Sequence, residues 1–131
     1  MNAILQPEGW TQPRGYANGV AATGRHVFVA GQIGWNAQCA FEARDFVGQF
    51  RQALANVVTV LAEAGAGPEH VTTMTWFITD KGAYLRDAKA VGRVWRELMG
   101  RNYPAMAVVQ VTALMEDAAL IEIQAQAVLP Q

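Results

Sequence analysis

The chain has 131 residues, 52% hydrophobic and 16% charged, with a formal net charge of -1. This length and composition predict one domain, residues 1–131, with a sizeable core, and the near-neutral charge argues against a nucleic-acid or anionic-membrane partner. The single cysteine, Cys39, excludes an intrachain disulfide, and since no signal peptide or membrane-spanning run is evident, we expect a cytoplasmic protein.

The N-terminal quarter of the chain predicts loops and a hairpin. Residues 1–19 are rich in Gly, Pro, Asn and Gln and show no sustained period, which indicates irregular backbone. Val20–Ala22 and Val27–Ala30 are typical of two short strands joined by a tight turn. Gly31 follows the second strand, where a glycine permits close approach of another chain or a ligand.

The middle of the chain alternates helix, strand and helix. From about Asp45 to Ala64, apolar residues recur at three- and four-residue steps, which predicts a helix with one buried face. Val71 to Thr79 is rich in Thr, Trp, Phe and Ile and predicts a strand. A second helix is expected from about Gly82 to Met99. Its cations predict a solvated face: Arg86, Lys89, Arg93 and Arg96. One of these four side chains, or Arg14 or Arg101, could instead enter a neighbouring cleft.

The C-terminal stretch, Tyr103 to Val128, predicts two long strands that pair directly in an antiparallel hairpin, joined by a short connection at residues 115–118. Strand alternation then places Met106, Val108 and Glu122 on the same face, with even-numbered residues opposite even-numbered ones. The expected fold class is α+β, a mixed sheet with two helices packed on one face. The face that carries Met106 and Val108 would be uncovered, which predicts an oligomer.

Several segments in this order resemble the Rid family, the YjgF-type reactive-intermediate deaminases. They are GYANG at residues 15–19, AGQI at 30–33, the connection at Asp80, YPA at 103–105 and IEIQA at 121–125. The resemblance covers nearly the whole chain. It implies a chorismate-mutase-like subunit, a homotrimer with inward-facing sheets and a cleft between each pair of neighbouring subunits. It also implies hydrolysis of small enamines or imines to ketones and ammonia, with no metal and no organic cofactor.

The resemblance assigns roles to particular residues. Tyr16 matches the cleft tyrosine, Gly31 the glycine whose backbone borders the substrate, and Glu122 the acid near the attacking water. Glu122 and Tyr16 are therefore the expected catalytic residues, with Glu122 relaying protons and Tyr16 holding the water or the leaving nitrogen. The expected substrate-binding residues are Gly31, Trp35, Met106, Ala107 and Val108.

On the residues alone, a structural role for both Glu122 and Tyr16 is the commoner case. Neither His26, His70 nor Cys39 lies at metal-ligand spacing, so the sequence itself gives no metal site.

Met106 departs from the family pattern, because the best-known deaminases carry there an arginine that clamps the substrate carboxylate. A thioether cannot donate the paired hydrogen bonds of a guanidinium, so 2-aminoacrylate is not the expected substrate. Two hypotheses remain. One is a deaminase for another imine or enamine, such as an aminomuconate-type acid from aromatic degradation. The other is a non-catalytic trimer that binds a small metabolite or carboxylate. The ribonuclease activity also attributed to the family is disfavoured by the charge balance.

Overall fold

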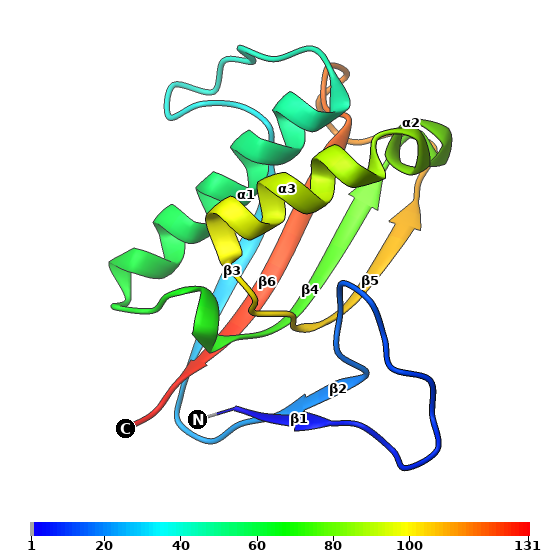
Figure 1. The fold of residues 1–131 in the computed structure, drawn as a ribbon. Helices are drawn as coiled ribbons and strands as arrows, with labels where there is room; N and C mark the ends of the chain where they lie inside the picture. The colour runs from blue at the N-terminus through cyan, green and yellow to red at the C-terminus, as the bar shows by residue number, and fades with distance from the viewer. Residues whose placement is uncertain (1) are drawn as a thin grey trace.

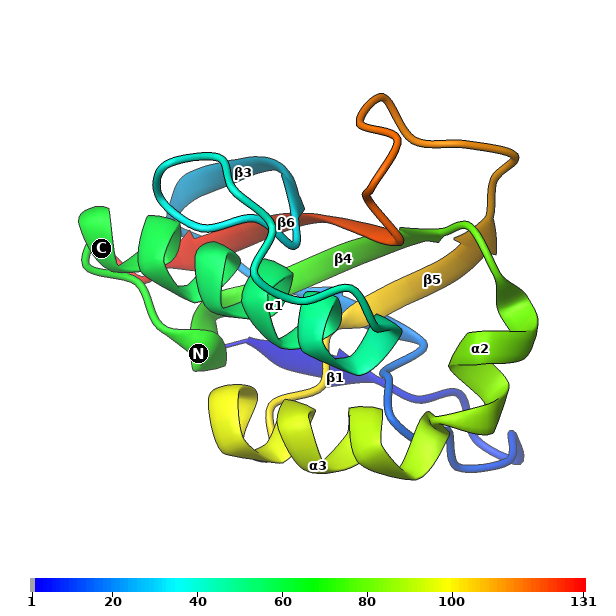
Figure 2. The same cartoon turned by 90° about the horizontal axis from the view of Figure 1, so that it is seen from above.

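A computed structural model describes residues 2–131 and shows helices packed on one face of a mixed sheet (Figures 1 and 2). The sheet has the order β3-β6-β4-β5, and a separate two-stranded sheet pairs β1 with β2. The predicted α+β class is therefore confirmed. The strands are β1 (Ala3–Leu5), β2 (Gly19–Ala21), β3 (Arg25–Ile33), β4 (Val71–Ile78), β5 (Ala105–Gln110) and β6 (Ile121–Leu129). The helices are α1 (Phe46–Glu63), the 3-10 turn η1 (Pro68–His70), α2 (Lys81–Arg86) and α3 (Ala88–Met99).

Helix α1 confirms the helix predicted from about residue 45 to 64. The side chain of Asp45 accepts a hydrogen bond from the Gly48 backbone N–H at 3.2 Å, which caps the first turn. Gly65, with φ of +77°, ends the helix in the left-handed region that glycine tolerates. The buried face of α1 packs on the sheet. Within residues 2–131, no helix is long and apolar enough to cross a membrane.

The second predicted helix is divided at Asp87. Asp80 caps α2 through the Ala83 N–H at 3.2 Å. At Asp87 the backbone has φ of -101° and ψ of 16°, so the chain turns before α3 begins. The expectation of one continuous helix from 82 to 99 is therefore wrong. The apolar stripe continues through this turn, which is why periodicity did not indicate it.

The predicted direct pairing of the two C-terminal strands is wrong. Strand β4 lies between them, parallel to β5 and antiparallel to β6. The connection between β5 and β6, residues 111–120, is correspondingly longer than expected. The central position satisfies both edges of β4 and buries its residues Met74, Trp76 and Ile78.

This strand order also changes which side chains share a face. Trp76 pairs with Val108 on one side and with Ile123 on the other, so these three face the helices. Glu122 pairs with Phe77 and faces the open side of the sheet. The expectation that Met106 and Val108 share a face with Glu122 is therefore wrong, because both pack against the core under the helices.

The N-terminal segment is also more ordered than predicted. Strand β2 pairs with β1, and β3 pairs with β6, so the expected hairpin of residues 20–30 does not form. The stretch that was expected to be irregular contains β1. The Ala17 N–H donates to the Pro104 carbonyl at 2.9 Å, which attaches the segment around Tyr16 to the start of β5.

Candidate functional site

The first group of predicted site residues meets beside β5, in what we call the tyrosine–methionine hollow. Gly15, with φ of +79°, turns the chain there, and the bridge at Ala17 holds Tyr16 against the edge of β5. Tyr16 is 42% exposed. The hollow has a volume of about 280 Å³ and is lined by Arg14, Gly15, Tyr16, Trp76, Tyr84, Met106 and Val108.

The tyrosine–methionine hollow offers a cation and two hydroxyl groups. Arg14 supplies the positive charge that Met106 lacks. A tyrosine hydroxyl is protonated at neutral pH and can donate a hydrogen bond, and burial raises the pKa of Tyr84 further above its ordinary value. A small organic acid could therefore be held here through its carboxylate.

The second group meets on the open side of the sheet, in what we call the glutamate hollow. It has a volume of about 210 Å³ and is lined by Gly31, Ile33, Trp35, Met115, Glu116 and Glu122. Two carboxyl groups face this hollow, one from β6 and one from the connection that precedes it. Carboxyl groups in such a place can accept a proton from water and return it to a leaving group.

Gly31 gives the Glu122 side chain its space. The pairing of β3 with β6 shifts register between Val29 and Gln32, and Gly31 lies in that irregular stretch. A Cβ atom at Gly31 would lie 2.7 Å from the carboxyl carbon of Glu122 and 2.8 Å from its Oε2. No real side chain tolerates this contact, so Glu122 keeps its position only while residue 31 is glycine.

Asn56 of α1 fixes the end of β3 beside the glutamate hollow. Its Nδ2 donates to the carbonyls of Ile33 at 3.1 Å and Trp35 at 2.8 Å. The ring of Trp35 packs on Phe41, with centroids 5.9 Å apart. The helix therefore positions the backbone that borders Glu122.

The predicted site residues thus form two separate groups. Tyr16, Met106 and Val108 line one hollow, and Gly31, Trp35 and Glu122 line the other. Ala107 lies exposed on the open face and lines neither hollow. Within residues 2–131, no group of three His, Cys, Asp or Glu side chains is placed to hold a metal ion.

The chain is similar to known proteins over most of its length. Residues 11–129 match the model of the protein family described as Endoribonuclease L-PSP. A Rid family protein of unknown function from Yersinia pestis has a crystal structure that matches with a TM-score of 0.87, at 29% identity, over 98% of each chain. This chain belongs to the Rid family.

Two further relatives extend the comparison for this Rid protein. A RutC family protein of Pyrococcus horikoshii is 30% identical over 126 residues, which cover 95% of this chain and 96% of the relative. The crystal structure of E. coli TdcF with bound serine matches at 31% identity with a TM-score of 0.68, over 97% of this chain and 98% of TdcF.

Sequence reasoning missed several residues that line the hollows of this Rid protein. Trp76 and Tyr84 lie on the apolar stripes of the predicted strand and of the second predicted helix, a pattern that indicates only core packing. Glu116 lies in the β5–β6 connection, which was expected to be a short turn. Arg14 was considered only as one of several cations that could enter the cleft.

Proposed function

We propose that this Rid protein is a homotrimer that hydrolyses small imines or enamines at sites shared between subunits. The tyrosine–methionine hollow of one subunit would face the glutamate hollow of its neighbour. The observation that carries the proposal is the separation of the six residues. Met106 and Val108 point to the helix side, and Glu122 points to the open side, so one chain cannot bring them around one small substrate.

The reaction needs only water and proton transfers, because an imine carbon is already electrophilic. Glu122 would accept a proton from water as the oxygen adds to the carbon and would return it to the imine nitrogen, giving a carbinolamine. Glu122 would then take the proton of the new hydroxyl group and pass it to the same nitrogen, so that the C–N bond breaks as the C=O bond forms, and ammonia and a ketone leave. The Tyr16 hydroxyl would donate a hydrogen bond to the oxygen or nitrogen during these steps.

Substrate choice follows from the side chain at residue 106. Without a guanidinium on β5, a three-carbon acid such as 2-aminoacrylate loses its paired contact. Arg14 lines the same hollow and offers a single cation from a loop. We therefore expect larger unsaturated amino acids, of the aminomuconate type, to be better substrates.

Binding without hydrolysis is the second candidate function. Met106 favours it, because loss of the clamp leaves a hollow that holds a ligand without orienting it for attack. That TdcF holds serine in its crystal structure is in keeping with a small-metabolite site in the family.

Hydrolysis can be measured with imino acids made in place by an amino-acid oxidase, with semicarbazide present to trap the imine. An active protein diverts the imine to ketone and ammonia, so less semicarbazone forms. We expect this effect in the wild type with larger imino acids and a weak effect with 2-aminoacrylate. Met106→Arg should raise turnover of 2-aminoacrylate by roughly tenfold or more. If no imine is hydrolysed faster than in buffer, the binding function is the correct one.

A further inference from the structure

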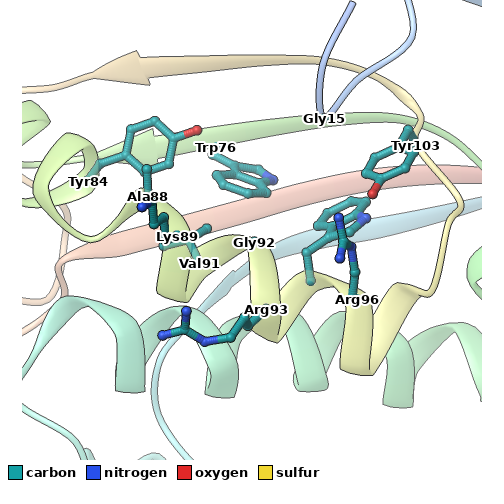
Figure 3. Close-up of a pocket in the computed structure, with 11 residues that line it drawn as sticks. Gly15, Trp76, Tyr84, Ala88, Lys89, Val91, Gly92, Arg93, Arg96 and Tyr103 are labelled. Carbon is teal, nitrogen blue, oxygen red and sulfur yellow. The ribbon is translucent and has the colours of Figure 1, made fainter.

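A larger hollow lies between α3 and the sheet, next to the tyrosine–methionine hollow (Figure 3). We call it the aromatic hollow. Its volume is about 490 Å³, within the range of small-molecule sites. It shares Gly15, Trp76 and Tyr84 with the tyrosine–methionine hollow, so the two hollows are neighbours.

One wall of the aromatic hollow is a continuous row of rings. Trp76 lies against Tyr84, with centroids 6.1 Å apart, and against Trp95 at 5.9 Å. Trp95 stacks on Tyr103 at 5.9 Å, with an angle of 10° between the ring planes. The planes of Trp76 and Tyr84 are inclined by 78° and those of Trp76 and Trp95 by 41°, so a flat apolar group finds parallel ring faces at Trp95 and Tyr103 and edge-to-face contacts towards Trp76.

The rim of the aromatic hollow is positively charged. Lys89, Arg93 and Arg96 follow one another at four- and three-residue steps on α3, so they share a side of the helix. The ion pairs of residues 2–131 are Arg51–Glu97 and Arg86–Asp87, which leaves these three cations without an acidic partner in that part of the chain. Arg96 extends from the helix towards Tyr103 (Figure 3).

The aromatic wall of this hollow contains two hydrogen-bond donors without acceptors. Among the buried side-chain atoms of the described chain, Nε1 of Trp76 and Nε1 of Trp95 have no partner. Both residues are 4% exposed. Buried indole N–H groups usually have a partner, so their presence in the wall of a hollow points to a ligand that brings an oxygen.

We propose that the aromatic hollow binds planar aromatic carboxylates. The ring would pack against the aromatic row, the carboxylate would meet Arg96 and its neighbouring cations, and a small shift of the indoles would give them an acceptor. This binding goes beyond the proposed hydrolysis and does not depend on it. Only the extension to substrate choice, in which an aromatic imino acid reaches from this hollow towards Tyr16, depends on the proposed function.

Gly92 provides a way to fill the aromatic hollow without damaging the fold. It lines the hollow from α3, and a Cβ atom there would meet no heavy atom within 4 Å. Gly92→Leu should therefore fold with an unchanged or higher Tm, because leucine also favours the helix. Gly92→Ala is the matched control, since it gives the same helix preference with little loss of volume.

The test is calorimetric titration of the wild-type protein with indole-3-carboxylate, compared with indole and with cyclohexanecarboxylate. We expect indole-3-carboxylate to bind more tightly than either indole or cyclohexanecarboxylate. Arg96→Gln should weaken its binding by about tenfold or more, and Arg86→Gln, which removes the same charge outside the hollow, should not. Gly92→Leu should abolish binding, whereas Gly92→Ala should retain it.

The indole N–H signals in a ¹H–¹⁵N spectrum report on the same event. Those of Trp76 and Trp95 should shift on titration, and those of Trp10 and Trp35 should not. Equal binding of indole and indole-3-carboxylate, or binding that survives both Gly92→Leu and Arg96→Gln, would overturn the proposal. Neither result would bear on imine hydrolysis, which is measured separately.

Discussion

At the scale of single residues, the contact between Gly31 and Glu122 decides where a carboxylate is available. The glutamate side chain occupies the space that a Cβ atom at residue 31 would take. This contact, and not backbone strain, explains why residue 31 is a glycine. It also couples the two residues, because a change at either affects the same carboxyl group.

We expect Glu122→Gln to lower imine turnover by about a hundredfold or more, because the amide cannot accept the proton of water. The melting temperature should be nearly unchanged, since the shape is preserved. Gly31→Ala should lower turnover too, by moving a carboxylate that remains chemically intact. Semicarbazide-coupled rates and thermal melts on the same samples measure both effects. Unchanged turnover in Glu122→Gln would remove this residue from the mechanism.

At the scale of elements, Gln49 joins α1 to the segment that enters β6. It is 1% exposed, and its Nε2 donates to the Ala118 carbonyl at 2.8 Å and the Ala43 carbonyl at 3.2 Å. Its Oε1 accepts from the Leu120 N–H at 2.8 Å. A buried polar side chain that satisfies three backbone groups holds the long connection in place.

Gln49→Leu should therefore lower the free energy of unfolding by about 2 to 4 kcal/mol, because it leaves partly buried backbone groups unpaired. Gln52→Leu, one turn away, removes a single hydrogen bond to Asn56 and should cost about 1 kcal/mol or less. Urea unfolding of the two variants provides the comparison. An equal loss of unfolding free energy in the two variants would mean that the buried hydrogen bonds of Gln49 contribute no extra stability.

The ion pair between Arg51 of α1 and Glu97 of α3 joins the two long helices at 2.8 Å. Hydrogen bonding and charge attraction from Arg51 lower the pKa of Glu97. A lowered carboxyl pKa contributes stability above the pKa of the unfolded chain, and that contribution is lost as pH falls through the folded value. Both side chains are about half exposed, so the effect should be small.

Glu97→Gln should make the melting temperature slightly less dependent on pH over the acidic range in which glutamate titrates, about pH 3 to 5. In Arg51→Gln, the pKa of Glu97 followed by NMR should rise towards its ordinary value. A pKa that stays low without Arg51 would assign the shift to another cause.

At the scale of the whole molecule, the open face of the sheet is the surface that the trimer would use. Phe28 is 69% exposed there and stacks on His26 with centroids 6.2 Å apart. Val109, on β5, is 40% exposed. Exposed apolar side chains on a sheet that is covered on its other face favour contact with another subunit.

Sedimentation should give a mass three times that of the 14.2 kDa chain. Phe28→Asp should dissociate the trimer by placing an unpaired charge in the contact. Val108→Asp is the informative comparison, because Val108 packs against the core and its substitution should destabilise the subunit itself. A folded wild-type monomer at micromolar concentration would contradict both the trimer and the shared site.

The sequence by itself determined the features that depend on local geometry. The three- and four-residue period located α1, and the run from Val71 located β4, because both patterns repeat within a few residues. The motif resemblance singled out Tyr16, Gly31 and Glu122, each of which borders a hollow.

Only the tertiary structure decided which strands are neighbours and therefore which residues meet. Alternation assigns side chains to two faces of a strand, but it does not say that β4 inserts between β5 and β6. That insertion lets β4 pair on both edges and buries Trp76 under the helices. The stabilisation comes from residues that are far apart in the chain. It also turns Met106 away from Glu122, so the residues of one predicted site belong to opposite faces of the subunit.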